Sequence, residues 1–216
     1  AVYGFSLILL NTIKDLKPDY LAISFDLAKP TFRHKVFKEY KAKRAKPSKE
    51  LSKQVPLVKE VAKSLNIPIF EARGYEADDV IGTLAKTLTK ENPQLRVTIV
   101  TGDLDLLQLV DQRISVYTMR RGLTQMVTYT PARVKERYHF DPQYLPDFKG
   151  LAGDTSDNIP GVKGIGEKTA QKLIIKYGSL EEIFQALEEE NLDLPTRTAN
   201  LLRDSRYRLT YIQLVA

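Results

Sequence analysis

Cysteine and tryptophan are absent from this chain of 216 residues, and histidine occurs only at positions 34 and 139. Without cysteine there is no disulfide scaffold, no thiol nucleophile and no thiolate zinc site. So few histidines also disfavour a histidine-rich metal site or a Ser-His-Asp triad. No apolar run approaches the roughly 18 residues that a membrane span needs, and the first residues lack the positive charge of a signal peptide. We therefore expect a monomeric protein of the cytoplasm that does not contact membranes.

The composition is that of a globular protein, because 43% of the residues are hydrophobic and 28% are charged. The length allows one or two domains with a substantial core. The net charge of +6 is unevenly spread: between Lys29 and Lys63 there are twelve basic and three acidic residues, whereas the rest of the chain carries −3. Such a basic segment is either a set of solvated helix faces or a surface for a polyanion, since clustered Lys and Arg displace counterions from phosphates.

Hydrophobic periodicity predicts an α/β fold. Apolar, β-branched runs predict strands at 20–25, 67–71, 96–101, 114–118 and 126–130. Apolar stripes predict helices at 2–16, 48–65 (capped by Ser48) and 76–88. This alternation is typical of a mostly parallel sheet flanked by helices. The strand signal stops near residue 140, so we expect an α/β domain at 1–140 and an all-helical subdomain at 141–216.

Acidic residues recur where the predicted strands end or the next helices begin. They are, in chain order, Asp26, Glu76, Asp78, Asp79, Asp103 and Asp105. The C-terminal ends of parallel strands form one edge of a sheet, and ligands bind at that edge, so these side chains should face the same crevice. Asp154 and Asp157, in the helical part, extend the set.

Two explanations fit acidic residues in such places. Acids favour helix N-termini, which accounts for one or two of them. It does not account for Glu-x-Asp-Asp, Asp-x-Asp and Asp-x-x-Asp all at chain turns. Crowded carboxylates raise one another's pKa unless cations neutralise them, and oxygen ligands suit Mg²⁺ or Mn²⁺ rather than zinc. We therefore expect a site for two divalent cations, Mg²⁺ or Mn²⁺.

A glycine-rich turn at 161–168 precedes a predicted helix. Its glycines allow a phosphate to approach the backbone, and the first N–H groups of the helix point toward such an anion. The pattern matches a helix-hairpin-helix, which grips duplex backbone without reading bases, and a plain helix–helix turn is the alternative. The residues expected to bind DNA or shape this turn are Gly161, Lys163, Gly164, Ile165, Gly166 and Lys168, with Ile165 anchored in the core.

Together these motifs resemble a known family, the flap endonucleases with a PIN-like core, represented by the 5′-nuclease domain of bacterial DNA polymerase I. The resemblance covers nearly the whole chain, and its motifs occur in family order. They are Ser24-Phe25-Asp26, Phe32-Arg33-His34, Tyr40-Lys41-Ala42-Lys43-Arg44, Gly74–Asp79, Thr101–Asp105, Gly153–Asn158 and Gly161–Lys168.

The resemblance implies hydrolysis of DNA phosphodiesters at a 5′ flap, nick or end by a divalent-metal mechanism. All the acidic residues named above would be inner or outer metal ligands. Residues 29–63 would form a helical arch in which Arg33, Lys41 and Arg44 act at the scissile phosphate. Tyr40 would stack on an unpaired base or pack in the core, and Lys43 would bind DNA. The glycine turn would hold the downstream duplex, with K⁺ as a possible ligand.

The family pattern begins one strand earlier than this sequence, with an aspartate in an Asp-Gly context. We therefore expect either a fragment of a longer protein, in which a polymerase domain can follow, or a truncated relative with impaired activity.

The alternative functions follow from that departure and from the acidic core. A DNA-binding module without catalysis is the main one. A PIN-type ribonuclease shares the acidic core but would not need the second acidic group or the glycine turn. A metal-dependent phosphatase would have no use for the basic segment.

Overall fold

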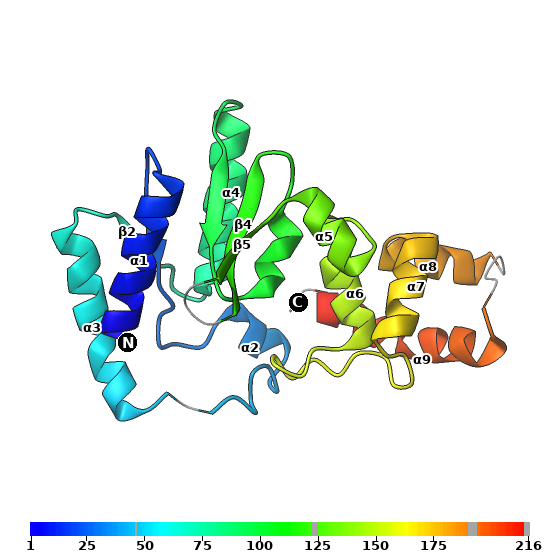
Figure 1. Ribbon diagram of the computed structural model, residues 1–216. Coiled ribbons are helices and arrows are strands. Elements are labelled where there is room, and N and C mark those ends of the chain that lie inside the picture. The colour runs from blue at the N-terminus through cyan, green and yellow to red at the C-terminus, as the bar shows by residue number, and fades with distance from the viewer. Residues whose placement is uncertain (46, 122–124, 190–193, 214–216) are drawn as a thin grey trace.

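The computed structural model describes residues 1–45, 47–121, 125–189 and 194–213 (Figure 1). The α-helices are α1 (Val2–Leu16), α2 (Phe32–Val36), α3 (Lys49–Ser64), α4 (Ala77–Glu91), α5 (Pro131–Tyr138), α6 (Leu145–Ala152), α7 (Glu167–Tyr177), α8 (Leu180–Glu188) and α9 (Thr196–Gln213). Two 3-10 helices are η1 (Leu104–Leu109) and η2 (Pro142–Tyr144). The strands are β1 (Ile23–Ser24), β2 (Ile69–Phe70), β3 (Val97–Val100), β4 (Ile114–Arg121) and β5 (Gln125–Tyr129). Every strand and helix predicted above is present, and β1 and β2 are shorter than expected.

The described strands form two small sheets rather than the single sheet that the alternation predicted. In one, β1 and β2 run parallel with Ile23 opposite Ile69. In the other, β3 and β4 run parallel with Val97 opposite Ile114, and β5 joins β4 antiparallel. The backbone bonds of β1 are directed to β2, as Ile23 N–H donates to Pro68 O, and no pairing joins β1 to β3 among the described strands. The α/β class with mostly parallel pairing is confirmed.

A continuous hydrophobic core links the larger sheet to the helical half. Ile99 of β3 and Val116 of β4 belong to the same buried cluster as Leu151 of α6 and Leu173 of α7. Figure 1 shows α5 and α6 between the sheet and the helices α7, α8 and α9. The chain passes from strands to helices after β5, and one core is shared by both parts, so the division at residue 140 stays a prediction.

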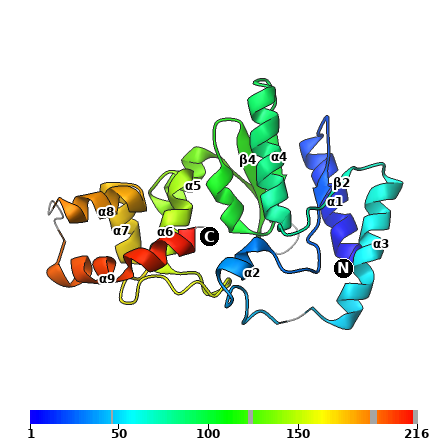
Figure 2. The same ribbon diagram turned by 180° about the vertical axis from the view of Figure 1, so that it is seen from behind.

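Helices α1 and α3 pack side by side at the opposite end of the molecule, and the view from behind shows the same arrangement (Figure 2). Leu9, Val58 and Ala62 are buried between them and their neighbours. Ser48 caps α3 as predicted, because its side chain accepts the N–H of Leu51 at 3.1 Å. None of the described helices combines the length and apolar character needed to cross a lipid bilayer.

The basic segment at 29–63 serves two purposes. Its second half is α3, which packs on α1. Its first half, α2 and the turns after it, lies beside the loop that follows α6, and Figures 1 and 2 agree on this placement. Position 46, within the predicted arch, lies outside the described residues. The part of the segment that contacts the acidic residues is the stretch before position 46, through Arg33, Lys41 and Arg44.

Candidate active site

The end of β1 and the start of α4 are joined by Asp26. Its Oδ1 accepts the backbone N–H of Ala77 at 2.7 Å. Glu76 is the N-cap of α4, and its own N–H donates to Asp79 Oδ2 at 2.7 Å in a capping box. A negative side chain at a helix N-terminus is stabilised by the free N–H groups and the helix dipole. This local chemistry places Asp26 and Glu76 at one spot although they are far apart in sequence.

Asp78 shows that three chain segments converge. Its pKa is raised to about 6, first by burial and then by the negative charges of Asp103 and Asp26. Asp26 follows β1, Asp78 lies in the first turn of α4 and Asp103 follows β3. Asp103 is the N-cap of η1, where its side chain accepts the N–H of Asp105 at 3.0 Å. The ends of two strands and the start of one helix thus present carboxylates to a common space.

Tyr40 connects this space to the acidic loop of the helical half. Its hydroxyl donates at 3.1 Å to Glu76 Oε2 and lies 3.1 Å from Asp157 Oδ2. Burial, followed by the charges of Glu76 and Asp157, raises the pKa of Tyr40 far above its ordinary value, so the hydroxyl remains a donor. The side chain is only 3% exposed. Of the two roles that the sequence allowed for Tyr40, the structure shows packing in the core. Its buried ring has no exposed face on which a base could stack.

Basic side chains neutralise the carboxylates on both sides of Tyr40. Lys41 Nζ donates to Glu76 at 2.8 Å, and Arg44 donates to Asp157 at 2.5 Å. Arg33 donates to Asp79 at 2.8 Å. Burial lowers the pKa of the guanidinium, but this bond and the negative charges around it together outweigh burial and raise that pKa. Asp79 is thus held by Arg33 and by its own helix cap.

Lys149 of α6 forms ion pairs with two further carboxylates of the site, those of Asp105 and Asp154. Its ammonium donates to Asp105 and, at 2.5 Å, to Asp154 Oδ2. Burial raises the pKa of Asp105 to about 6, because it outweighs the stabilising bond from Lys149. Burial would also raise the pKa of Asp154, but bonds from Lys149 and Ser156 outweigh it and lower that pKa to about 2. Lys149 is not among the site residues predicted from the sequence, because a lone lysine five residues before Asp154 carries no signal of its own.

We call these carboxylates the acidic cluster: Asp26, Glu76, Asp78, Asp79, Asp103, Asp105, Asp154 and Asp157. Their contacts and mutual charge effects link them into one region. Within the described residues, however, no three of them converge closely enough to form a ready-made metal site. The donors are all oxygens, which suit hard divalent cations, and the crowding of Asp78, Asp103 and Asp26 is what such cations relieve. The carboxylate oxygens of the acidic cluster therefore fit divalent cations. In this structure Lys41, Arg44 and Lys149 form ion pairs with some of these carboxylates.

The turn at 39–44 is fastened to the loop at 154–159. That loop is closed by paired backbone bonds between Asp154 and Ile159. Lys41, in a left-handed conformation (φ 54°), donates its N–H to Asp157 O at 3.0 Å. In return Asn158 donates from its side chain to Glu39 O at 2.8 Å. The basic segment and the second acidic loop therefore form one unit around Tyr40.

The glycine turn lies between α6 and α7. Ile165 is 4% exposed and belongs to the main core, as predicted. Gly161 adopts φ 61°, and a Cβ there would lie 2.4 Å from the N atom of Gly153, so the turn requires glycine at this position. Lys163 and Lys168 are exposed on either side of Gly164 and Gly166. The structure leaves these lysines accessible to a large anionic partner.

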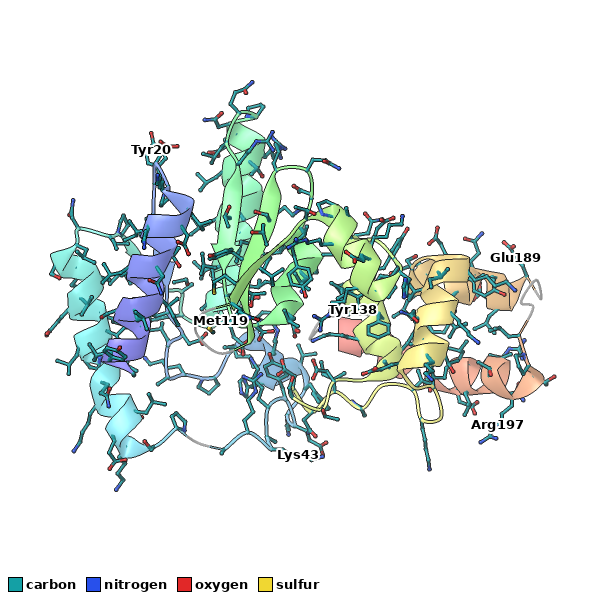
Figure 3. All side chains as sticks on the ribbon, viewed as in Figure 1. Tyr20, Lys43, Met119, Tyr138, Glu189 and Arg197 are labelled. Atoms are coloured by element: carbon teal, nitrogen blue, oxygen red, sulfur yellow. The ribbon has the colours of Figure 1, made fainter. Side chains whose placement is uncertain are left out.

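A cavity of about 870 Å³ borders the acidic cluster on the side of the helical half. Lys43 of the basic segment and Tyr138 of α5, both labelled in Figure 3, line it together with Arg137, Lys149 and Lys168. Lys149 and Lys43 come from the two chain segments that also surround the acidic loop. The cavity thus adjoins the acidic cluster and is lined by cationic side chains from several elements.

Comparison with known proteins accounts for the whole chain. Residues 1–139 match the 5′–3′ exonuclease, N-terminal resolvase-like domain, and residues 140–216 match the 5′–3′ exonuclease, C-terminal SAM fold. The chain belongs to the 5′–3′ exonuclease family. The resemblance seen in the motifs is therefore confirmed at the level of the family.

Relatives of this chain include two bacterial polymerases. DNA polymerase I of Bacillus subtilis (strain 168) is 46% identical over 189 residues, which are 88% of this chain and 21% of that protein. DNA polymerase I of Chloroflexus aurantiacus is 43% identical over 207 residues, which are 94% of this chain and 21% of that protein. The chain thus spans about a fifth of the length of the curated relatives it matches.

Two solved structures of phage T5 enzymes share the fold of this chain. T5 5′-exonuclease with bound zinc superimposes with a TM-score of 0.77 at 23% identity, over 100% of this chain and 81% of that one. A T5 flap endonuclease complex with DNA and metal ions gives a TM-score of 0.76 at 23% identity, over 100% of this chain and 80% of that one. The α/β domain followed by a helical region is thus a fold that these enzymes share.

Proposed function

We propose that this member of the 5′–3′ exonuclease family hydrolyses DNA phosphodiesters at 5′ flaps, nicks or ends with two divalent cations, Mg²⁺ or Mn²⁺. The observation that carries the proposal is the junction at Tyr40, whose hydroxyl lies 3.1 Å from both Glu76 and Asp157. It joins acidic residues of the α/β half to those of the helical half. A site built from both halves can hold duplex with one and cleave with the other.

The proposed ligands are all members of the acidic cluster. Asp26, Asp78 and Asp103 would hold the first cation. The charges of Asp26 and Asp103 help to raise the pKa of Asp78, and a cation bound there would relieve that repulsion. Asp105, Asp154 and Asp157 would serve a second position. Cations held there would activate a water and neutralise charge on the phosphate.

Lys41, Arg44 and Arg33 are proposed to stabilise charge on the phosphate oxygens. Lys41 and Arg44 now pair with Glu76 and Asp157, so they already point into the site. Charge-assisted donors placed in advance stabilise a developing anion without reorganisation. Arg33 now pairs with Asp79, and this pair also holds the start of α4.

DNA binding is proposed for the glycine turn and for the cavity wall. Lys163 and Lys168 would contact duplex backbone beside Gly164 and Gly166, and K⁺ is proposed to bind at this turn. Lys43 would contact the strand near the cavity. These are backbone contacts, so we expect selection of DNA shape and not of sequence. The relatives are DNA polymerases I, and we propose that this exonuclease domain works beside a covalently linked polymerase domain.

A structure-specific DNA-binding module without catalysis is the second candidate. The observation that favours it is that no three described carboxylates converge as a ready-made metal site. Under this alternative the basic partners would hold the acidic cluster permanently closed. DNA would bind, but no product would form with either cation.

A single substitution separates the two candidates. Asp103→Asn removes one negative charge from the centre of the acidic cluster while keeping its size. We expect cleavage of a 5′-flap duplex in Mg²⁺ or Mn²⁺ to fall roughly a hundredfold or more, with DNA affinity retained. Asp141→Asn, at an exposed carboxylate paired with Lys135, is the matched control and should cleave normally. Equal turnover in Asp103→Asn and the parent, or binding without product in the parent, would reject the nuclease proposal.

A further inference from the structure

Lys149 occupies an unusual position, between two carboxylates of the acidic cluster. We propose that Lys149 is a built-in counter-cation, which holds Asp105 and Asp154 together in the metal-free protein and must be displaced before a divalent cation can bind them. Lys149 would thereby set the metal affinity of this side of the site. The inference rests on the proposed function, because it concerns the same cations.

The pairing is shielded from solvent, as is the longer pair Lys41–Asp157 at 3.8 Å, whose side chains are 20% and 9% exposed. The side chains of Lys149, Asp105 and Asp154 are only 18%, 23% and 11% exposed. By contrast, the pairs Lys86–Asp111 and Lys135–Asp141 are between 42% and 60% exposed. A shielded ion pair is strongly coupled, since removing one partner leaves the other charge without solvent, whereas exposed pairs contribute little. Lys149 is therefore a substantial competitor for these carboxylates.

The oxygens of Asp154 show why a cation must compete with Lys149. Oδ1 accepts the N–H and the hydroxyl of Ser156 at 2.8 and 2.5 Å. Oδ2 accepts the ammonium of Lys149 at 2.5 Å. The Ser156 bonds close the turn that fixes the acidic loop, so Oδ2 is the oxygen that a cation would take. On the opposite side, Lys149 also bonds to Oδ1 of Asp105.

The structure also provides room for the displaced ammonium. Lys149 and Asp154 line the cavity of about 870 Å³, whose wall includes Lys43 and Lys168. Lys149 lies on α6, which is fixed in the core by Leu145 and Leu151 at 2% and 0% exposure. Its flexible four-carbon stem can turn into the cavity while the helix stays in place. Cation binding would then move a positive charge to the side where we propose that the DNA backbone lies.

The decisive experiment measures Mn²⁺ binding to the metal-free chain by electron paramagnetic resonance, without DNA. We compare the parent with Lys149→Met, with Lys149→Arg, which keeps the charge, and with Lys86→Met, which loses an exposed lysine–aspartate pair. Removing a charge-assisted competitor should tighten the weaker Mn²⁺ site about tenfold or more in Lys149→Met. Lys149→Arg and Lys86→Met should bind as the parent does.

Two outcomes overturn the inference in distinguishable ways. If the parent binds Mn²⁺ and Lys149→Met binds it equally or more weakly, Lys149 does not compete, and the proposed function stands. If neither protein binds Mn²⁺, the proposed function fails and the inference fails with it. Circular dichroism confirms that each variant is folded.

A second measurement requires no variant. Reductive methylation of the parent, read by mass spectrometry, should modify Lys149 slowly without Mg²⁺ and faster with it. Lys135 should react at one rate in both conditions. A Lys149 rate that Mg²⁺ leaves unchanged, in a protein shown to bind Mg²⁺, would refute the displacement.

Discussion

At the scale of single residues, the acidic cluster is neutralised from within. Lys41, Arg44 and Lys149 each bring one positive charge to carboxylates that would otherwise repel one another. Within the described part of the chain Asp78 forms no ion pair with a basic side chain, and its pKa is raised to about 6. The stability of the free protein therefore depends on individual contacts in its site.

Tyr40→Phe tests the junction between the halves. The substitution removes a buried hydroxyl that lies 3.1 Å from both Glu76 and Asp157, and with it the one donor that these two carboxylates share. We expect the free energy of unfolding to fall by about 1–3 kcal/mol in urea denaturation. Tyr20→Phe, at an 85% exposed ring, is the control and should leave stability unchanged. Equal stability of the two variants would show that the Tyr40 bonds contribute nothing.

The raised pKa values of two carboxyl groups predict how the stability of the metal-free protein, measured in the presence of a chelator, depends on pH. The pKa values of Asp78 and Asp105 rise from 3.8 to about 6 on folding. Between those values the folded state binds more protons than the unfolded state, so the free energy of unfolding should fall as pH rises from about 4 to 6. The limit is about 3 kcal/mol per carboxyl before solvent screening reduces it. Urea denaturation at each pH measures this fall, and Asp78→Asn should make it shallower. A steady rise over this interval would contradict the burial of these groups.

The acidic members of the site could be predicted because their positions follow from the chain pattern. Asp26 and Asp103 come directly after strands, and Glu76 opens a helix, so parallel strands alone bring them to one edge. Lys149 could not be found in this way. A single lysine in a short helix resembles any solvated lysine until the helix is placed beside Asp105. Tyr40 shows the same limit, since burial of its ring depends on contacts with residues more than a hundred positions away.

At the scale of secondary structure, the helices were the most predictable part. The helix predicted after the glycine-rich turn is α7, and its Ala170, Leu173 and Ile174 are buried. The sheet was less predictable, because apolar runs identify strands but not their neighbours. Which strand pairs with which depends on backbone bonds between distant segments, and here β1 and β3 belong to different sheets.

Gly161→Ala tests the glycine turn as a structural element. Its left-handed backbone (φ 61°) and the contact of a new Cβ with Gly153 N at 2.4 Å oppose any side chain. We expect a loss of about 2 kcal/mol or more in the free energy of unfolding, measured by thermal and urea denaturation. Gly166→Ala is the matched control, because it has a negative φ and a Cβ there meets nothing within 4 Å. A loss as large in Gly166→Ala would mean that the geometry of Gly161 is not the cause.

At the scale of the whole molecule, charge is segregated on a shared core. The basic segment meets the acidic loop of the helical half at the turn 39–44, while the exposed Lys163 and Lys168 lie on the glycine turn. Because one core joins the larger sheet to the helical half, these surfaces keep a fixed relation to each other. A nucleic acid that spans both would be held by several phosphate contacts at once.

Salt dependence measures those contacts. With about four phosphates bound, affinity for a flap duplex should fall roughly a hundredfold between about 50 and 200 mM salt. Lys163→Gln should reduce the magnitude of the logarithmic slope by about one, and Lys90→Gln, at the exposed end of α4, should leave it unchanged. Fluorescence anisotropy provides both slopes. A flat response in the parent would exclude phosphate-dominated binding.

The central claim is that the acidic cluster is one site for divalent cations, built by both halves of the chain. Anomalous diffraction from crystals soaked in Mn²⁺ tests it most directly. The account predicts two peaks about 3.5–4 Å apart, one among Asp26, Asp78 and Asp103 and one beside Asp105 and Asp154. Peaks only on the outer surface, or none among these carboxylates at millimolar Mn²⁺, would contradict it.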